Sequence, residues 1–238
     1  MSRSRSSMLL LTAFVTCLLA GAASGCGGGR DEQALIRSYF IAARSNDRAT
    51  LGNVATVSFD PEDDGVVTNA RVVSVSPEER RPLRAKELAG ALAQARAAES
   101  EFNEKKRTYQ DTNMDAINRV LEAERANRPV AARDQAIQAE WTKWREETMQ
   151  HSKAISDAEA EINAERRVPA ASVFDPNNPI DVTQFDGEII SKQVTVEANV
   201  ARGGQEEPRT FTITMQRVVL TGADGQPVDG RWIITDIG

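Results

Sequence analysis

The sequence is poor in the residue types that most enzymes use: it has one histidine, His151, and two cysteines, Cys17 and Cys26, among 238 residues. One histidine cannot form the histidine cluster of a zinc site, and no cysteine–histidine pair activates a nucleophile. The chain also lacks a phosphate-binding glycine loop, a Gly-x-Ser-x-Gly elbow and a metalloprotease motif. We therefore expect no catalytic residue, no metal and no cofactor, and no residue set identifies a substrate.

The first 25 residues have the composition of an export signal. Arg3 and Arg5 form a short basic region, and an apolar run extends from Met8 to Ala23. A run of this length fits the core of a signal peptide and is short for a helix that spans a membrane. We predict that residues 1–25 are a signal peptide.

The signal ends in Ala22-Ala23-Ser24-Gly25-Cys26, which resembles the lipobox of bacterial lipoproteins. Ala23 stands where that family usually has leucine. The resemblance implies cleavage before Cys26 and acylation of Cys26, which makes residues 26–30 a lipidated cysteine with a glycine tether. The alternatives are an uncleaved membrane anchor and cleavage ahead of a free cysteine.

Cleavage also removes Cys17, so no intrachain disulfide is possible and the fold must rest on packing. By similarity to proteobacterial lipoproteins, glycine rather than aspartate after Cys26 implies the outer membrane, with the protein facing the periplasm. In a Gram-positive host, the anchor would lie in the outer face of the cell membrane. Acylated Cys26 is thus the expected membrane contact.

Basic residues are too few for a nucleic-acid-binding protein. Without Arg3 and Arg5, the mature chain has 27 lysines and arginines against 35 acidic residues, a formal charge of −8. Binding to phosphate backbones needs a net positive surface. We expect no nucleic acid partner, and we expect no adhesion to anionic lipid by charge alone.

A charged, alanine-rich block from Leu83 to Arg167 predicts two long helices. In its second half, apolar or seam-compatible residues recur in alternating steps of four and three, the spacing of a coiled-coil seam. They are Ile137, Trp141, Trp144, Thr148, His151, Ile155, Ala158 and Ile162. A break at residues 127–130 would let the helices fold back antiparallel, with Phe102 level with Ile155. The rival is one broken helix that pairs with a second chain.

Local signals mark the outer ends of this block. Ser76-Pro77-Glu78-Glu79 has the form of a helix capping box, and Pro169 is expected to stop the second helix. We therefore assign residues 77–169 to an inserted helical hairpin. Residues 31–76 and 170–238 form the remaining α+β base.

The base is predicted to combine helices with a small antiparallel sheet. Amphipathic and alternating patterns predict helices at 31–46 and 48–57 and strands at 66–75, 188–202, 209–220 and 231–237. A change of phase in the alternation near Arg217 predicts a β-bulge.

This order of elements, with the helix turn Ser45-Asn46-Asp47, resembles the nuclear transport factor 2-like, or SnoaL-like, cone fold. The resemblance covers about residues 31–75 and 185–238. It implies that the hairpin lies between early and late strands of the sheet and projects from a small globular base. The alternative is an unrelated α+β sandwich.

The cone fold also implies an internal pocket, which is usually lined by apolar groups. The candidate lining residues are Tyr39, Phe40, Phe59, Phe211, Met215 and Trp232. Enzymes of this fold usually place an acid or a histidine in the pocket. No histidine is available here, and Asp186 and Asp236 are interpreted as core or turn residues.

Trp141 and Trp144 have two interpretations. They either pack against the first helix or form an exposed docking surface, because they would face the small Ala116 and the polar Asn113. His151 on the same seam is interpreted as a packing residue, with a pH response as the alternative.

The sequence therefore predicts an envelope lipoprotein that acts as a non-catalytic scaffold, in which the hairpin binds another envelope protein. Self-association through the hairpin is a further possibility. The alternative of a different class is a small-molecule-binding protein or enzyme that uses the apolar pocket of the base.

Overall fold

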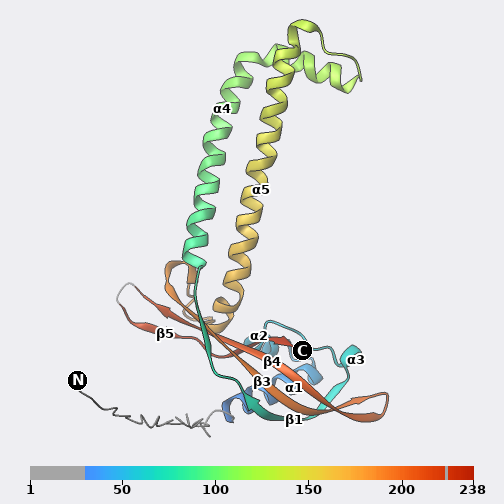
Figure 1. The fold of residues 1–238 in the computed structure, drawn as a ribbon, viewed down its shortest axis with the longest axis vertical. Coiled ribbons are helices and arrows are strands. Elements are labelled where there is room, and N and C mark those ends of the chain that lie inside the picture. Colours follow the sequence, from blue (N-terminus) through green and yellow to red (C-terminus); the bar gives the residue numbers. More distant parts are fainter. Residues whose placement is uncertain (1–29, 223–224) are drawn as a thin grey trace, which may run out of the picture.

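The computed structural model describes residues 30–222 and 225–238, so the predicted signal peptide, Cys26 and the glycine tether lie outside the described residues. The described chain has two parts (Figure 1): an antiparallel sheet that curls over short helices, and two long helices that extend from one end of it. The predicted combination of an antiparallel sheet, N-terminal helices and long helices is confirmed.

The sheet is built on one long ribbon of two strands. β3 (Asp186–Arg202) and β4 (Gln205–Thr221) pair antiparallel along their whole length. Gly203 and Gly204 join them with φ values of 60° and 84°, which residues with a Cβ rarely adopt. The outer strands are β1 (Val66–Val75) and β2 (Glu79–Pro82) beside β3, and β5 (Pro227–Asp229) and β6 (Ile233–Ile237) beside β4.

The ribbon buries opposite faces at its two ends. Ile213 lies on one face of β4, whereas Val218 and Leu220 lie on the other, because side chains alternate along a strand. The register between β3 and β4 continues through Arg217 without a shift. The predicted bulge is therefore not in the β3–β4 ribbon, where the alternation changes phase because the buried face changes. The nearest irregularity is in the pairing of β4 with β6, whose register shifts between Thr214 and Met215.

Three short helices precede β1, and they are α1 (Arg30–Ser45), α2 (Arg48–Val54) and α3 (Pro61–Asp64). Asp47 caps α2, since its carboxylate accepts a hydrogen bond from the Thr50 amide at 3.1 Å. α2 is shorter than predicted because the chain beyond it joins β6, where the Thr56 amide donates to the Ile234 carbonyl.

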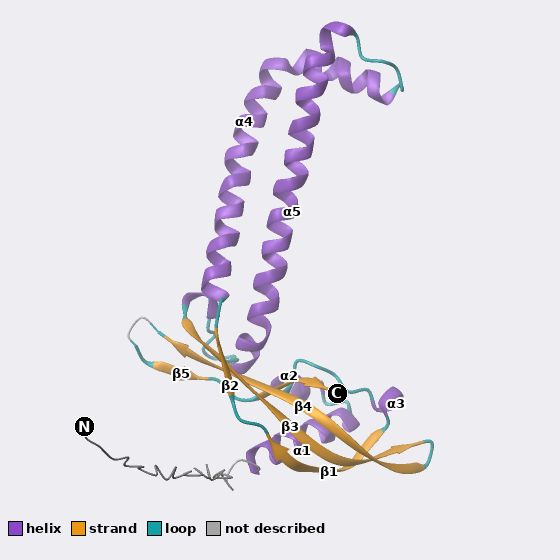
Figure 2. Cartoon of the chain, in the orientation of Figure 1, coloured by secondary structure: helices purple, strands orange, loops and turns teal. Residues whose placement is uncertain are grey.

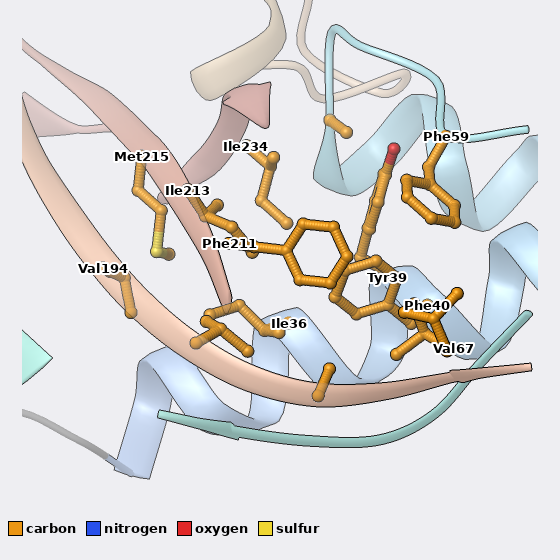
Figure 3. Close-up of a cluster of buried hydrophobic side chains, with 14 residues drawn as sticks. Ile36, Tyr39, Phe40, Phe59, Val67, Val194, Phe211, Ile213, Met215 and Ile234 are labelled. Carbon is orange, nitrogen blue, oxygen red and sulfur yellow. The ribbon is translucent and has the colours of Figure 1, made fainter. Parts of the chain in front are cut away.

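The main core lies between α1 and one face of the sheet (Figure 3). Its buried members include Ile36, Tyr39, Phe40, Phe59, Val194, Val196, Phe211, Ile213, Met215 and Ile234. The Phe40 ring centre lies 5.4 Å from those of Tyr39 and Phe59, with edge-to-face geometry in both pairs. Burial of each large apolar side chain contributes about 1.5–3 kcal/mol, so this core stabilises the base.

Gln33 on α1 covers part of the free edge of β1. Its side-chain amide donates to the Ala70 carbonyl at 2.8 Å and accepts from the Val72 amide at 2.8 Å. β1 is the last strand on its side of the sheet, where backbone groups otherwise lack partners. α1 is therefore joined to β1 by hydrogen bonds as well as by packing.

A second core, the foot core, lies at the base of the long helices. It contains Leu83, Ala85, Val173, Val182, Ile189, Val218 and Leu220, with Val182 in the short 3-10 turn η2 (Val182–Gln184). Beside it, the Ser172 hydroxyl donates to the Arg231 carbonyl at 2.8 Å and accepts from the Val218 amide at 3.1 Å. A side chain at Gly230 would collide with this hydroxyl.

Two long helices leave the foot core side by side (Figure 2). They are α4 (Ala85–Arg125) and α5 (Gln135–Ser172), with the 3-10 turn η1 (Ala132–Asp134) before α5. Only five of the 41 residues of α4 and four of the 38 residues of α5 are buried. Most of the surface of both helices is therefore exposed or partly exposed.

The start of α4 differs from the prediction. Ser76 does not cap a helix, because Glu79–Pro82 pairs with β3 as strand β2, and α4 begins at Ala85. The amide of Arg84, just before the helix, donates to the Glu165 carboxylate on α5 at 2.9 Å. Arg84 provides no side-chain cap for α4, so a carboxylate of the second helix accepts the hydrogen bond of an amide at the start of α4.

The end of α5 also differs from the prediction. The helix continues past Pro169 to Ser172, and the Val173 amide donates to the Pro169 carbonyl at 3.1 Å. Proline removes its own amide hydrogen bond but leaves its carbonyl free to accept one. A proline one turn before the end is therefore compatible with this helix.

α4 bends at Asn113, whose φ of −118° and ψ of 19° are not helical. Its side-chain amide donates to the Tyr109 carbonyl at 3.0 Å, a local bond that competes with helical geometry. Beyond the bend, α4 crosses over α5 (Figure 1). The predicted break at residues 127–130 lies between α4 and η1, but the register of the two helices differs from the prediction by about one turn. Phe102 is therefore not level with Ile155, and its ring centre lies 4.7 Å from that of His151.

Candidate functional site

Trp141 and Trp144 lie between α4 and α5. All eight predicted seam residues of α5 are buried or half-buried. Trp141 is 7% exposed, and the Trp144 ring lies 5.3 Å from the Phe102 ring and 5.6 Å from the Tyr109 ring. Both indole rings therefore pack inside the helix pair instead of forming an outer docking surface.

The middle of this seam is polar as well as aromatic. The Lys106 ammonium lies 5.5 Å from the Trp141 ring centre and donates to the Thr148 hydroxyl at 2.7 Å. Among the described residues, three buried atoms here have no hydrogen-bond partner: Tyr109 Oη, Trp141 Nε1 and Trp144 Nε1. Each such atom costs about 1–3 kcal/mol, so the helices are held less firmly here than by an apolar seam. Burial also raises the pKa of the Tyr109 phenol.

Ion pairs join the helices at their distal end. Arg119 on α4 donates to both carboxylate oxygens of Asp134 at 3.0 and 2.7 Å. The hydrogen bonds and the charge of Arg119 lower the pKa of Asp134. Arg145 on α5 donates to Glu124 at 2.9 Å. These contacts hold the end of α4 against the beginning of α5.

The predicted pocket residues of the base lie in or against the main core. Tyr39, Phe40, Phe211 and Met215 are buried, and Trp232 is half-buried against them. The side chains of Tyr39, Phe40, Phe211 and Met215 fill the space between α1 and the sheet (Figure 3). The Tyr39 hydroxyl donates to the Val57 carbonyl at 3.2 Å, and burial raises its pKa to about 12. The structure thus brings these residues together as packing.

An ion pair is buried beside Trp232. Lys192 on β3 pairs with Glu32 on α1, and their side chains are 7% and 6% exposed. The Lys192 ammonium lies 3.8 Å from the Trp232 ring centre, and the Arg217 guanidinium lies 5.1 Å from it. Sequence reasoning missed this cluster, although the alternation in β3 places Lys192 on the inward face. The partner Glu32 comes from a distant helix, which no local pattern shows.

α1 turns a basic face outward. Arg30, Arg37 and Arg44 are exposed and recur every seven residues, so they lie on one side of the helix. Ala34 and Ile41 lie between them, and Ile41 is 50% exposed. We name Arg30, Arg37 and Arg44 the basic stripe.

Beside the stripe is an open hollow of about 970 Å³ between α1 and β1, β3 and β4, which we name the α1 groove. Its charged lining residues are Arg37, Arg44, Arg71, Arg209 and Glu197. Glu197 pairs with Arg71, whereas the other three arginines have no carboxylate partner in the described part of the chain. The groove is therefore positive although the chain as a whole is negative. The negative net charge gave no indication of this positive groove. The seven-residue spacing of Arg30, Arg37 and Arg44 was the one local signal from which it could have been predicted.

Comparison with protein-family models, curated proteins and solved structures finds no match. The resemblances to bacterial lipoproteins and to the cone fold remain predictions.

Within residues 30–222 and 225–238, no helix is both long enough and apolar enough to cross a bilayer. Nor do three or more histidine, cysteine or acidic side chains gather there as a metal site. Two features that this region offers to other molecules are the outer surface of α4 and α5 and the α1 groove.

Proposed function

We propose that the protein is an envelope lipoprotein in which α4 and α5 form an inserted, antiparallel coiled-coil hairpin that binds another envelope protein without catalysing a reaction. The supporting observation is that both helices extend away from the base with most of their residues unburied (Figures 1 and 2). Such an extension adds little to the core that stabilises the fold. It does add a long surface for contact with a partner.

In this proposal, residues 1–25 are an export signal and acylated Cys26 holds the protein at a membrane. The outer membrane, facing the periplasm, is the expected place in a Gram-negative host, and the outer face of the cell membrane is expected otherwise. Stable anchoring takes more than one acyl chain or a second membrane contact. The lipobox-like residues before Cys26 support this part of the proposal.

Two exposed methionines are suitable positions at which to test the helical surface. Met114, next to the bend in α4, is 55% exposed, and Met149 on α5 is 65% exposed. Methionine adapts to irregular surfaces and is common where proteins bind partners. The base provides a matched apolar control in Val73 on β1, which is 49% exposed.

The test places a photo-crosslinking amino acid at position 114, 149 or 73 of the full-length chain in its native membrane. We expect crosslinks to one defined envelope protein from 114 and 149 and none from 73. The double variant Met114→Glu/Met149→Glu should reduce copurification of that protein at least about tenfold, the effect of a lost contact of roughly 1.4 kcal/mol. Val73→Glu should not reduce it.

Two other outcomes are informative. Crosslinks between two copies of this chain would show that the helices bind a second copy rather than another envelope protein. Equal crosslinking from the helices and from position 73 would contradict a binding role for the hairpin.

A further inference from the structure

We propose that the basic stripe and the α1 groove bind the phosphate groups of anionic lipids in the leaflet that holds the anchor. The inference rests on the proposed acylation of Cys26. It adds a second membrane contact that the net charge of the chain does not suggest.

The position of α1 in the chain carries the first part of the argument. Arg30, where α1 begins, is four residues after Cys26. Four extended residues span at most about 14 Å. An acyl chain on Cys26 would therefore keep the first arginine of the stripe within that distance of the lipid surface. No other described element is so close to the anchor along the chain.

The chemistry of the groove carries the second part. Arg37, Arg44 and Arg209 line it, and none of them is neutralised by a carboxylate in the described part of the chain. The planar guanidinium group offers paired donors that match phosphate oxygens. Each basic side chain near an anionic leaflet strengthens contact with it about fivefold. Ile41, exposed between two of these arginines, adds apolar area at the level of the headgroups.

The shape of the molecule is consistent with this contact. α1 and the distal ends of α4 and α5 lie at opposite ends of the molecule (Figure 1). A membrane bound to α1 would therefore leave the helices directed away from the lipid. The acidic excess of the rest of the chain favours the same orientation, because an anionic surface repels it.

The test uses the full-length acylated chain with Ile41→Cys labelled by an environment-sensitive dye, since acylated Cys26 does not react. The protein is reconstituted into phosphatidylcholine vesicles with or without phosphatidylglycerol. We expect blue-shifted emission in the anionic vesicles only, reversed at about 0.5 M salt because charges are screened. A dye at Met149→Cys, on the exposed surface of α5, is the control and should not respond.

Matched variants identify the arginines. Arg37→Gln/Arg44→Gln should reduce the membrane-bound fraction of the dye at position 41 by more than about tenfold. Arg107→Gln/Arg125→Gln removes the same charge from exposed positions of α4 and should leave the emission unchanged.

Three results would overturn the proposal. Equal emission in neutral and anionic vesicles would show that α1 does not contact anionic lipid. A response to inorganic phosphate without vesicles would make the groove a site for soluble anions. Failure of the chain to bind neutral vesicles would show that it lacks the anchor, and this result would refute the lipoprotein assignment as well. It can be told apart from a failure of the groove alone, in which the chain still binds neutral vesicles.

Discussion

The base and the two long helices are held together in different ways. The base concentrates fully buried side chains such as Ile213 and Ile234 in cores on both faces of one ribbon. α4 and α5 share a single seam in which aromatic residues alternate with polar ones such as Lys106 and Asn113. The base therefore supplies most of the apolar packing that stabilises the fold, and the helices carry most of their residues on exposed surface.

Among the described residues both regions leave buried polar atoms without a partner: Glu32 Oε2 and Arg217 Nε in the base, and three atoms gathered in the seam. In the base, the Tyr39 hydroxyl donates to a carbonyl, and at the foot core the Ser172 hydroxyl at the end of α5 bonds to both β4 and the loop before β6. The seam leaves the Tyr109 hydroxyl and two indole N–H groups without a partner. Separation of the helices would return these groups to water, so the cost of opening is lower at this point.

The largest expected effect lies in the main core. Ile213→Ala removes a side chain with no exposed area and should lower the free energy of unfolding by about 3–4 kcal/mol, because it leaves a cavity. Urea denaturation followed by circular dichroism measures the change. Met149→Ala on the surface of α5 should stay within about 0.5 kcal/mol. A similar loss in the free energy of unfolding for the two variants would contradict the contrast between the base and the helices.

A smaller effect is expected at the junction of the two regions. Glu165 accepts hydrogen bonds from Arg81 at 2.8 and 3.0 Å and from the Arg84 amide. Glu165→Ala should cost about 1 kcal/mol and raise hydrogen exchange at the start of α4. Glu161→Ala, at an exposed position one turn earlier in α5, is the control. Equal exchange in the two variants would show that Glu165 does not hold the start of α4.

The same junction should respond to acid. Burial alone would raise the pKa of Glu165, but the hydrogen bonds and charges of Arg81 and Arg84 together lower it. A lowered folded pKa stabilises the protein above the unfolded value of about 4.3, and this contribution is lost as the pH falls through the folded pKa. The cost of Glu165→Ala should therefore shrink below about pH 4 in denaturation series at different pH. A cost that does not depend on pH would contradict this origin.

The two tyrosines sharpen the comparison further. Tyr39→Phe removes a hydrogen bond to Val57 and should cost about 1 kcal/mol. Tyr109→Phe removes a hydroxyl without a partner and should be neutral or slightly stabilising. Thermal unfolding of both variants tests this order, and a greater loss at Tyr109 would mean that its hydroxyl is satisfied in solution.

One further effect is visible only in alkali. The raised pKa of Tyr39, about 12, stabilises the fold fully below the unfolded value of about 10 and ceases to do so as the pH rises through about 12. Absorbance of the phenolate should show an ionisation near pH 12 that Tyr39→Phe removes. Ionisation of Tyr39 near pH 10 would show that its hydroxyl is accessible to water.

Local signals predicted much of the fold. The strand at Val66–Val75 follows from its β-branched residues, and the inward side of α5 follows from its heptad spacing. β2 was missed because Glu79–Pro82 is polar and forms a strand only through pairing with β3, a contact between residues far apart in the chain. The α1 groove was missed for the same reason, since its arginines come from α1, β1 and β4. Tertiary contacts of this kind leave little trace in local periodicity.

The hydrogen bonds of Gln33 have a consequence for colloidal behaviour. The side-chain amide of Gln33 donates to one backbone group of β1 and accepts from another, so it occupies the place that an incoming strand would take there. In the proposed anchored form, copies of the protein would diffuse in two dimensions and meet often, which would make an open strand edge a route to aggregation. The Gln33 side chain would therefore hinder pairing of β1 with a strand of a neighbouring molecule.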